Sequence, residues 1–225
     1  MQRKIITTAD GSKTIQIEDW NEQYHSVHGA IQEANHVYIK HGLLFFNSEI
    51  LQNQDDKISI LEIGFGTGLN AILTLLAAQQ LKLNIDYYGI EAYPVSPEEL
   101  NQLNYSETLG IKDNSFEDIH KSDWETSHHI TEQFSLTKQQ KFFDDITDVN
   151  SYDIIYFDAF GARVQPELWT EAIFEKMYKA LKPNGVLVTY SAKGTVKRAL
   201  RSIGFELKRL EGPPGKRHML RAIKS

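Results

Sequence analysis

The chain has 225 residues, of which 41% are hydrophobic and 24% charged, and it contains no cysteine. This length suits one domain with a substantial core, and the lack of cysteine excludes disulfides and thiolate metal sites. No apolar run approaches the roughly 18 to 20 residues of a membrane span, and the charged N-terminus lacks the apolar core of a secretory signal. We therefore expect a single domain over residues 1–225, cytoplasmic and with no membrane contact.

The net charge of −6 hides a strong asymmetry along the chain. Residues 182–225 hold 11 Lys and Arg against two Glu, a net charge of +9. Residues 1–181 hold 13 basic and 28 acidic residues, a net charge of −15. The basic block is consistent either with a solvated surface or with a partner that carries negative charge. Composition leaves both possibilities open.

The first 55 residues predict a small addition ahead of the main sheet. The β-rich runs 5–8 and 13–17 flank Asp10-Gly11, a dipeptide suited to a tight turn, and they predict a hairpin. Residues 22–52 carry apolar side chains at helical spacing. This spacing predicts one or two helices before the core begins.

From residue 56 onward, strand patterns alternate with helix patterns. The expected strands are Ile58–Ile63, Asn84–Ile90, Phe134–Thr137, Tyr152–Phe157 and Val186–Tyr190, followed by an antiparallel pair at Gly204–Leu210 and Met219–Ile223. The expected helices are Leu69–Leu81, a short one around Leu100 and Leu103, Glu167–Leu181 closed by Pro183-Asn184-Gly185, and Thr195–Ile203. This alternation predicts an α/β fold with a doubly wound, mostly parallel sheet, a Rossmann-like core over residues 56–225.

A glycine-rich loop follows the first of these strands. Gly64, Gly66 and Gly68 would let the backbone turn tightly and approach a ligand at the N-terminus of the next helix. A pyrophosphate fingerprint would need glycine at Leu69, and the Gly-Lys-Ser/Thr of a P-loop is absent. The loop therefore favours a nucleoside ligand without phosphates over NAD or ATP, although a structural turn would also need glycine.

Acidic residues stand at the ends of the expected strands, where doubly wound sheets bind their ligands. Glu91 is suited to accept both hydroxyls of a ribose. Asp145, or the adjacent Asp144, could take an adenine amino group. Glu62 would contact the ligand or hydrogen-bond the loop, and Asp158 ends the central strand.

Several segments together resemble one family. Residues 61–70 resemble the cofactor loop of class I S-adenosylmethionine (SAM)-dependent methyltransferases and, more narrowly, that of the MnmC-type tRNA wobble-uridine modification enzymes. The segments that agree are Tyr24-His25-Ser26, Gly29-Ala30, Glu33–Tyr38, Asp158–Trp169, Gly194–Leu200 with Gly204-Phe205, and Gly215–Leu220. Two departures, Ala159 for a glycine and Gly161-Ala162-Arg163 for Ala-Pro-Ala, leave the shape of the substrate rim open.

The resemblance implies a Rossmann-like class I methyltransferase that uses SAM. Its reaction would be N-methylation of the 5-aminomethyl group of wobble (2-thio)uridine in tRNA, giving the 5-methylaminomethyl product. Asp158 is the implied catalytic residue, either as a base or as the group that orients the amine. The implied cofactor contacts are Tyr24, Glu62, Gly64, Gly66, Thr67, Gly68, Asn70, Glu91 and Asp145. No metal is expected, and the FAD-dependent domain of bifunctional members is expected to be absent.

The resemblance also implies contacts with the tRNA anticodon loop. Phe160 would stack on a base, and the expected phosphate contacts are Arg163, Lys193, Lys197, Arg198, Lys216 and Arg217. Trp169 is expected in the core. Other enzymes would make the aminomethyl precursor. Two alternatives stay open: a small-molecule amine methyl- or aminopropyltransferase of the same fold, and a non-catalytic module that binds SAM or RNA.

Overall fold

The computed structural model describes residues 2–53 and 56–225. The predicted boundary between the N-terminal addition and the core, after residue 55, adjoins the pair 54–55, which lies outside the described residues. The addition begins with the predicted hairpin, because β1 (Arg3–Thr7) pairs antiparallel with β2 (Lys13–Ile17). A 3-10 turn, η1 (Glu18–Trp20), leads to β3 (Glu22–Gln23), which pairs with β2. β3 is too short for its periodicity to show in the sequence.

The helical part of the addition is one continuous segment. It runs through α1 (Ala30–Ala34), the π-type η2 (Asn35–Leu44) and α2 (Phe45–Glu49), with helical backbone at both junctions. η2 packs against α3 (Leu69–Leu81), β8 (Tyr152–Phe157) and β9 (Leu181–Thr189). The predicted helices are therefore present, and they cover one face of the main sheet.

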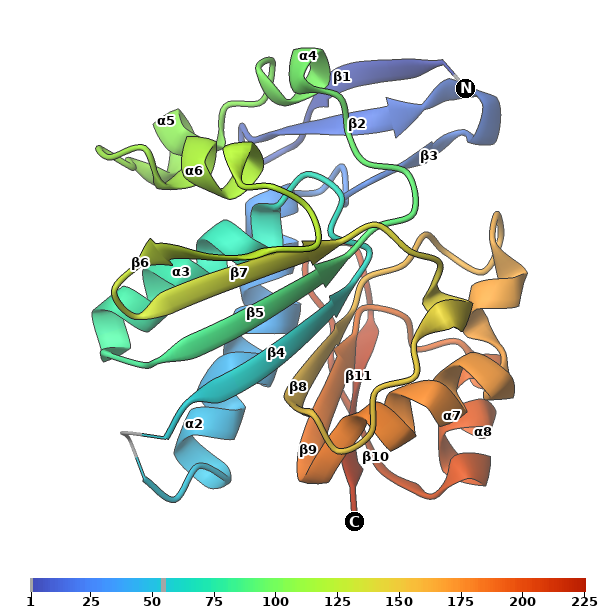
Figure 1. Ribbon diagram of the computed structural model, residues 1–225. Helices are drawn as coiled ribbons and strands as arrows, with labels where there is room; N and C mark the ends of the chain where they lie inside the picture. Colours follow the sequence, from blue (N-terminus) through green and yellow to red (C-terminus); the bar gives the residue numbers. More distant parts are fainter. Residues whose placement is uncertain (1, 54–55) are drawn as a thin grey trace.

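The main sheet has eight strands, shown in Figure 1. The remaining six are β4 (Ile58–Ile63), β5 (Ile85–Ile90), β6 (Ser127–Thr131), β7 (Phe134–Gln139), β10 (Phe205–Glu211) and β11 (His218–Lys224). Their order is β10-β11-β9-β8-β4-β5-β7-β6. The five strands from β9 to β7 are parallel, and β11 and β6 run antiparallel to their neighbours. The predicted doubly wound sheet with a C-terminal antiparallel pair is confirmed.

Helices cover both faces of this sheet, over two buried hydrophobic clusters. α3 and η2 lie over one cluster, and α7 (Glu171–Ala180) and α8 (Gly194–Ile203) over the other (Figure 1). Three short helices follow β5 at one end of the sheet: α4 (Pro97–Leu100), α5 (Tyr105–Leu109) and α6 (Ser115–Lys121). Short turns η3 (Phe143–Asp145) and η4 (Pro166–Trp169) lie near the ends of β7 and β8. Among the described residues, no helix combines the length and apolarity needed to cross a bilayer.

The largest difference from the predicted elements concerns the helix before β9. The helix expected over Glu167–Leu181 is divided into η4 and α7 because Thr170 between them has extended backbone. Pro183-Asn184-Gly185, expected to close that helix, lies within β9 instead, where the register with β8 shifts. Asn184 absorbs this irregularity with a positive φ of 63°.

Candidate active site

A cavity of about 1100 Å³ opens at the carboxyl ends of β4, β5 and β8. β4 has β5 on one side and β8 on the other, so the chain builds the sheet outward from β4 in two opposite directions. Doubly wound sheets bind their ligands at such a point. The lining comes from the glycine loop, the loop after β8, the N-terminal segment 17–33 and residues 190–193 and 215–216. This volume exceeds the usual range of small-ligand pockets, so the cavity has room for a nucleoside cofactor and a second group.

The glycine loop has a conformation that side chains would oppose. Gly64 has a φ of +89°, and a Cβ there would lie 2.7 Å from the carbonyl oxygen of Asp158. Gly66 has a φ of +50°, and its Cβ would lie 3.0 Å from Cδ1 of Tyr24. The Tyr24 ring therefore covers the loop, and Gly64 lets β4 and β8 end side by side.

Glu91, at the end of β5, is joined to the glycine loop. Its Oε2 accepts a hydrogen bond from the amide of Gly66 at 3.0 Å, and its Oε1 accepts one from the amide of Tyr93 at 3.0 Å. Burial raises the pKa of Glu91, while these amides lower it. A carboxylate oxygen has two lone pairs, so each Glu91 oxygen can still accept a hydroxyl of a ligand.

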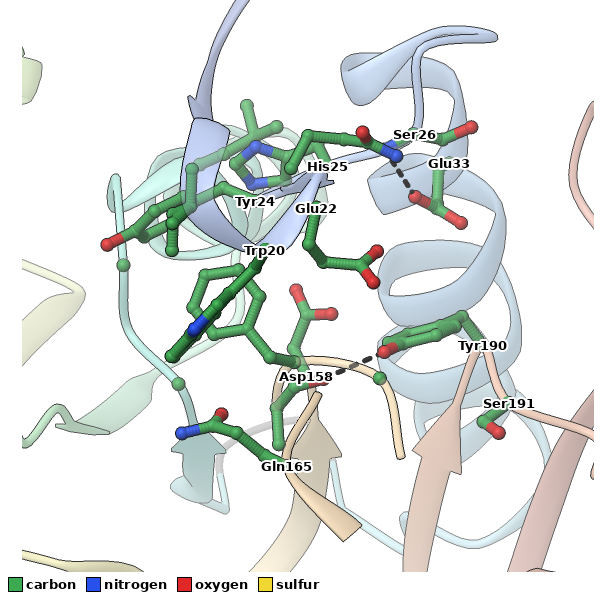
Figure 2. Close-up of a pocket in the computed structure, with 18 of the residues that line it drawn as sticks. Trp20, Glu22, Tyr24, His25, Ser26, Glu33, Asp158, Gln165, Tyr190 and Ser191 are labelled. Atoms are coloured by element: carbon green, nitrogen blue, oxygen red, sulfur yellow. Dashed lines mark hydrogen bonds between the residues drawn. The ribbon is translucent and has the colours of Figure 1, made fainter. Parts of the chain in front are cut away.

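Asp158 lines the cavity (Figure 2), where its carboxyl group is at the centre of a hydrogen-bond network. The hydroxyl of Tyr38 donates to its Oδ1 at 2.6 Å, and Nδ2 of Asn70 donates to its Oδ2 at 2.8 Å. The same Asn70 nitrogen donates to Glu62 at 2.8 Å, and the hydroxyl of Tyr87 donates to the other Glu62 oxygen at 2.8 Å. The network fixes the Asp158 carboxyl from two helices and two strands.

Burial dominates the electrostatics of these two carboxyl groups. It raises the pKa of Asp158 to about 7, with a further rise from the charge of Glu33. The hydrogen bonds from Tyr38 and Asn70 and the charge of Lys216 act in the opposite direction. Burial also raises the pKa of Glu62 well above its ordinary value. A carboxyl group that titrates near neutrality inside a cavity is suited to proton transfer.

The cofactor side of the cavity fits SAM in its polar groups. Oδ1 of Asn70 is buried and has no hydrogen-bond partner among the described residues. It is thus an unused acceptor at the cavity wall, suited to an ammonium such as that of a methionine group. Glu91 offers acceptors for ribose hydroxyls. The backbone of the glycine loop lines the same part of the cavity as Asn70 and Glu91.

The opposite wall is built from the N-terminal addition and the loop after β8. Phe160 makes edge contacts with Trp20 and Tyr24 at centroid distances of 5.7 and 4.8 Å. Nη2 of Arg163 donates to the backbone oxygens of Trp20 and Asn21 and, at 2.8 Å, to the carboxylate of Glu22. Arg163 therefore joins the loop after β8 to the N-terminal addition. The sequence predicted a phosphate contact for Arg163 and did not predict this structural one.

Three of the expected cofactor residues do not line the cavity. Thr67 is buried, with its hydroxyl 3.2 Å from that of Tyr105. A Cβ at Gly68 would meet the His120 ring at 3.0 Å, on the side away from the cavity. Asp145 is exposed on η3, from which Phe143 alone of that turn reaches the cavity. Any contact of these three residues with a cofactor stays a prediction.

The expected phosphate-binding cations separate into different environments. Lys193 lines the cavity mouth, whereas Lys197, Arg198 and Arg217 lie outside the lining. Lys216 lies inside, where its ammonium pairs with Glu33 and lies 4.1 Å from the centroid of the Tyr190 ring. Three further members of the basic block have partners elsewhere: Lys182, Arg221 and Lys224.

Sequence reasoning gave no role to several residues that shape the site. Glu33 and Tyr38 lay inside a segment that resembles the family, and Tyr190 ends an expected strand, so position could have pointed to all three. Trp20 and Glu22 carried no such signal because a separate small sheet brings them to the cavity. Trp169, expected in the core, is 5% exposed and donates to the carbonyl of Phe160 at 2.8 Å.

Comparisons with known proteins bear on the family and the fold. Residues 117–225 match a family described as S-adenosyl-L-methionine-dependent methyltransferase, a stretch that includes Asp158, Tyr190 and Lys216. The MNMC2 structure from Aquifex aeolicus superposes with a TM-score of 0.80 at 24% identity, covering 100% of this chain and 70% of that one. A probable spermidine synthase from Corynebacterium glutamicum gives a TM-score of 0.54 at 17% identity, covering 99% and 76%.

Two sequence relatives share the name tRNA 5-methylaminomethyl-2-thiouridine biosynthesis bifunctional protein MnmC. The protein from Nitrosospira multiformis is 27% identical over 89% of this chain and 34% of its own length. That from Leptospira interrogans is 28% identical over 90% and 32%. The chain thus spans about a third of the length of these curated relatives.

The fold of the chain, with its glycine loop after β4, is similar to that of class I SAM-dependent methyltransferases, and the match to a SAM-dependent methyltransferase family extends over residues 117–225. Within this class, the chain resembles the MnmC proteins along nearly its whole length, which confirms the resemblance found in its motifs.

Proposed function

We propose that this protein is a SAM-dependent methyltransferase that transfers a methyl group to the amine of a 5-aminomethyl group on wobble (2-thio)uridine in tRNA. The observation that carries the proposal is the Asp158 carboxyl, held by Tyr38 and Asn70 inside the cavity, with a pKa raised to about 7 by burial. The names of the sequence relatives supply the substrate class. A tRNA substrate would put the reaction in the cytoplasm, after enzymes that make the aminomethyl precursor.

The proposed cofactor contacts follow from the lining. Asn70, Glu91 and the backbone at Gly64 and Gly66 would hold SAM, with Tyr24 closing over the loop. When bound, SAM supplies an electrophilic methyl group on a sulfonium. The acceptor nitrogen must then lie on the open side of the cavity, beside Asp158.

Asp158 would prepare the amine. A primary amine near neutral pH is mostly an ammonium, which has no lone pair with which to attack. The ionised carboxylate would bind that ammonium, orient it and accept its proton, which the raised pKa favours. Tyr38 and Asn70 keep the acceptor oxygens fixed, so the carboxylate needs little rearrangement.

The RNA contacts are the outer part of the proposal. Phe160 would stack on a base, and Lys193, Lys197, Arg198 and Arg217 would contact phosphates around the cavity. An anticodon loop already presents single-stranded bases, so no duplex has to open.

The test is tritiated methyl transfer from SAM to bulk tRNA taken from a strain that lacks this activity, followed by nucleoside analysis. We expect label in 5-methylaminomethyl(-2-thio)uridine with wild type and none above background with Asp158→Ala. Label in another nucleoside would change the substrate. Label in putrescine or another small amine, with none in tRNA, would favour the small-molecule alternative.

A further inference from the structure

The ammonium of Lys216 occupies a defined position inside the cavity. It pairs with the carboxylate of Glu33 and lies over the face of the Tyr190 ring, 4.1 Å from its centroid. A carboxylate together with an aromatic face is a common arrangement for binding an ammonium ion. The adjacent residue, Arg217, is exposed. The neighbouring cation therefore does not enter the cavity, and the ammonium position is specific to Lys216.

The groups that receive this ammonium are held by other parts of the protein. Glu33 is 7% exposed and lies on α1, and its Oε2 accepts a hydrogen bond from the amide of Ser26 at 2.9 Å. The hydroxyl of Tyr190 donates to the carbonyl of Ala159 at 2.8 Å. Both groups would keep their positions if the Lys216 side chain moved away.

This ammonium position belongs to the same space as Asp158. Figure 2 shows Glu33, Tyr190 and Asp158 facing one another across the cavity. The charges of Glu33 and Lys216 both act on the Asp158 carboxyl, in opposite directions. An ammonium bound between Glu33 and Tyr190 is therefore within electrostatic reach of the group to which we assign the proton transfer.

We propose that Glu33 and the face of Tyr190 form the subsite that first receives the ammonium group of the substrate, from which it reaches Asp158 and loses its proton. Lys216 occupies this subsite until the substrate displaces it. The inference rests on the proposed function for the identity of the amine. It reassigns Lys216 from a phosphate contact to an internal stand-in for the substrate. Lys216 also keeps the buried Glu33 charge paired in the free protein, since an unpaired buried carboxylate is costly.

Displacement requires only a side-chain movement. Lys216 lies in the turn between β10 and β11, which is closed by backbone hydrogen bonds from Gly212 to Arg217 and from Lys216 to Pro213. The four-carbon stem can rotate while this backbone stays in place. Because the resident ammonium must leave first, the apparent affinity for substrate is lower than the intrinsic one.

The experiment compares two anticodon stem-loops that differ in one group, 5-aminomethyluridine or uridine at the wobble position. The ratio of their dissociation constants is the amine selectivity. We expect Glu33→Gln to lower this ratio by about tenfold, because the charged acceptor is lost. We expect Lys216→Met to raise it by about three- to tenfold, because the competing ammonium is gone. Binding of the uridine stem-loop by each variant is the reference value in this ratio.

Arg217→Met is the matched control, because it removes an adjacent cation outside the cavity. It should weaken both stem-loops equally. If Lys216→Met does the same, Lys216 is a phosphate contact and the subsite proposal is overturned. An unchanged ratio in both Glu33→Gln and Lys216→Met also overturns it.

Two variants of Tyr190 test the subsite even if Glu33→Gln does not fold. Tyr190→Phe keeps the ring face and should keep the amine selectivity, whereas Tyr190→Leu should lose it; equal ratios for these two would contradict the subsite. SAM affinity of each variant reports on the fold.

If wild type binds neither stem-loop, the proposed function fails, and putrescine becomes the ammonium probe. Tighter putrescine binding by Lys216→Met and weaker binding by Tyr190→Leu would then support the subsite, and no difference would overturn it.

Discussion

The two walls of the cavity are built in different ways. The cofactor wall, as we propose it, consists of Gly64, Gly66, Asn70 and Glu91, which lie within 28 residues of one another near the ends of adjacent strands. The substrate wall, as we propose it, consists of Trp20, Glu22, Glu33, Phe160, Tyr190 and Lys216, which come from the first 33 residues and from positions 160 to 216. Backbone conformation shapes the first wall, and side-chain pairing shapes the second. Changes to the first should therefore abolish binding, whereas changes to the second should tune it.

The largest expected effect is on the cofactor wall. Gly66→Trp adds a side chain where even a Cβ would lie 3.0 Å from Tyr24, at a φ of +50°. SAM affinity should fall by more than about 100-fold, or about 2.7 kcal/mol, while far-ultraviolet circular dichroism stays the same. Calorimetry gives the affinity, with Gly194→Ala on α8 as control. Undiminished binding by Gly66→Trp would contradict the cofactor site.

Asp158 lies between the two walls, so its removal should affect the rate of methyl transfer much more than the affinity for SAM. Asp158→Ala should reduce methyl transfer by about 10²- to 10⁴-fold, with a much smaller change in SAM affinity. Single-turnover transfer and calorimetry on the same protein measure the two quantities. Equal losses in both would make Asp158 a cofactor ligand and not the group that acts on the amine.

Cations that do not line the cavity should control the salt dependence of tRNA binding. The variant lacking Lys197, Arg198 and Arg217 should show a plot of log tRNA affinity against log salt that is flatter by about two to three units, since each phosphate contact contributes about −0.7 to −0.9. SAM affinity should stay unchanged because the cofactor wall lies on other elements. An affinity of wild type that does not respond to salt would favour the small-molecule alternative.

The pKa of Asp158 predicts opposite pH trends for activity and stability. Burial raises the pKa of Asp158 from 3.8 to about 7. Between these two pH values, the carboxyl group is protonated in the folded protein and ionised in the unfolded chain. Stability should therefore decline as pH rises through this window. The free energy of unfolding of Asp158→Asn should decline less than that of wild type between about pH 5 and about pH 8, as measured by urea denaturation.

In the same window, methyl transfer by wild type should increase with pH, because the ionised carboxylate is the form that binds the ammonium and accepts its proton. A rate profile of kcat/KM that is flat through pH 7 would show that the Asp158 charge is not required. Identical pH trends in stability for wild type and Asp158→Asn would show that the carboxyl does not titrate in this range.

The smallest effect is expected at the contact between the N-terminal addition and the loop after β8. The Arg163 side chain is 55% exposed, although it pairs with Glu22 at 2.8 Å. Arg163→Met should lower the free energy of unfolding by only about 0 to 1 kcal/mol and should raise the KM for tRNA more than it lowers kcat. A larger change in SAM affinity than in KM would mean that Arg163 acts on the cofactor wall.

The sequence by itself determined the core strands, α3 and the glycine loop, because hydrophobic period and glycine spacing are local properties of the chain. β4, α3 and β8 have the predicted bounds. It also pointed to Glu62, Glu91 and Asp158, because residues that end parallel strands meet at one edge of a sheet. The C-terminal pair was predicted as well, with β10 shifted by one residue along the chain and β11 longer by one residue at each end.

Only the tertiary structure decided the substrate wall. Glu33 and Lys216 are 183 residues apart, and no local pattern shows that their charges pair. The basic block of the sequence was a single feature, yet folding turns Lys216 inward, packs Arg221 against Phe45 and leaves Arg198 and Arg217 exposed. The physical reason is that charge counts along the chain carry no direction, whereas burial, which sets the pKa of Asp158 and the pairing of Glu33, depends on every element packed around them.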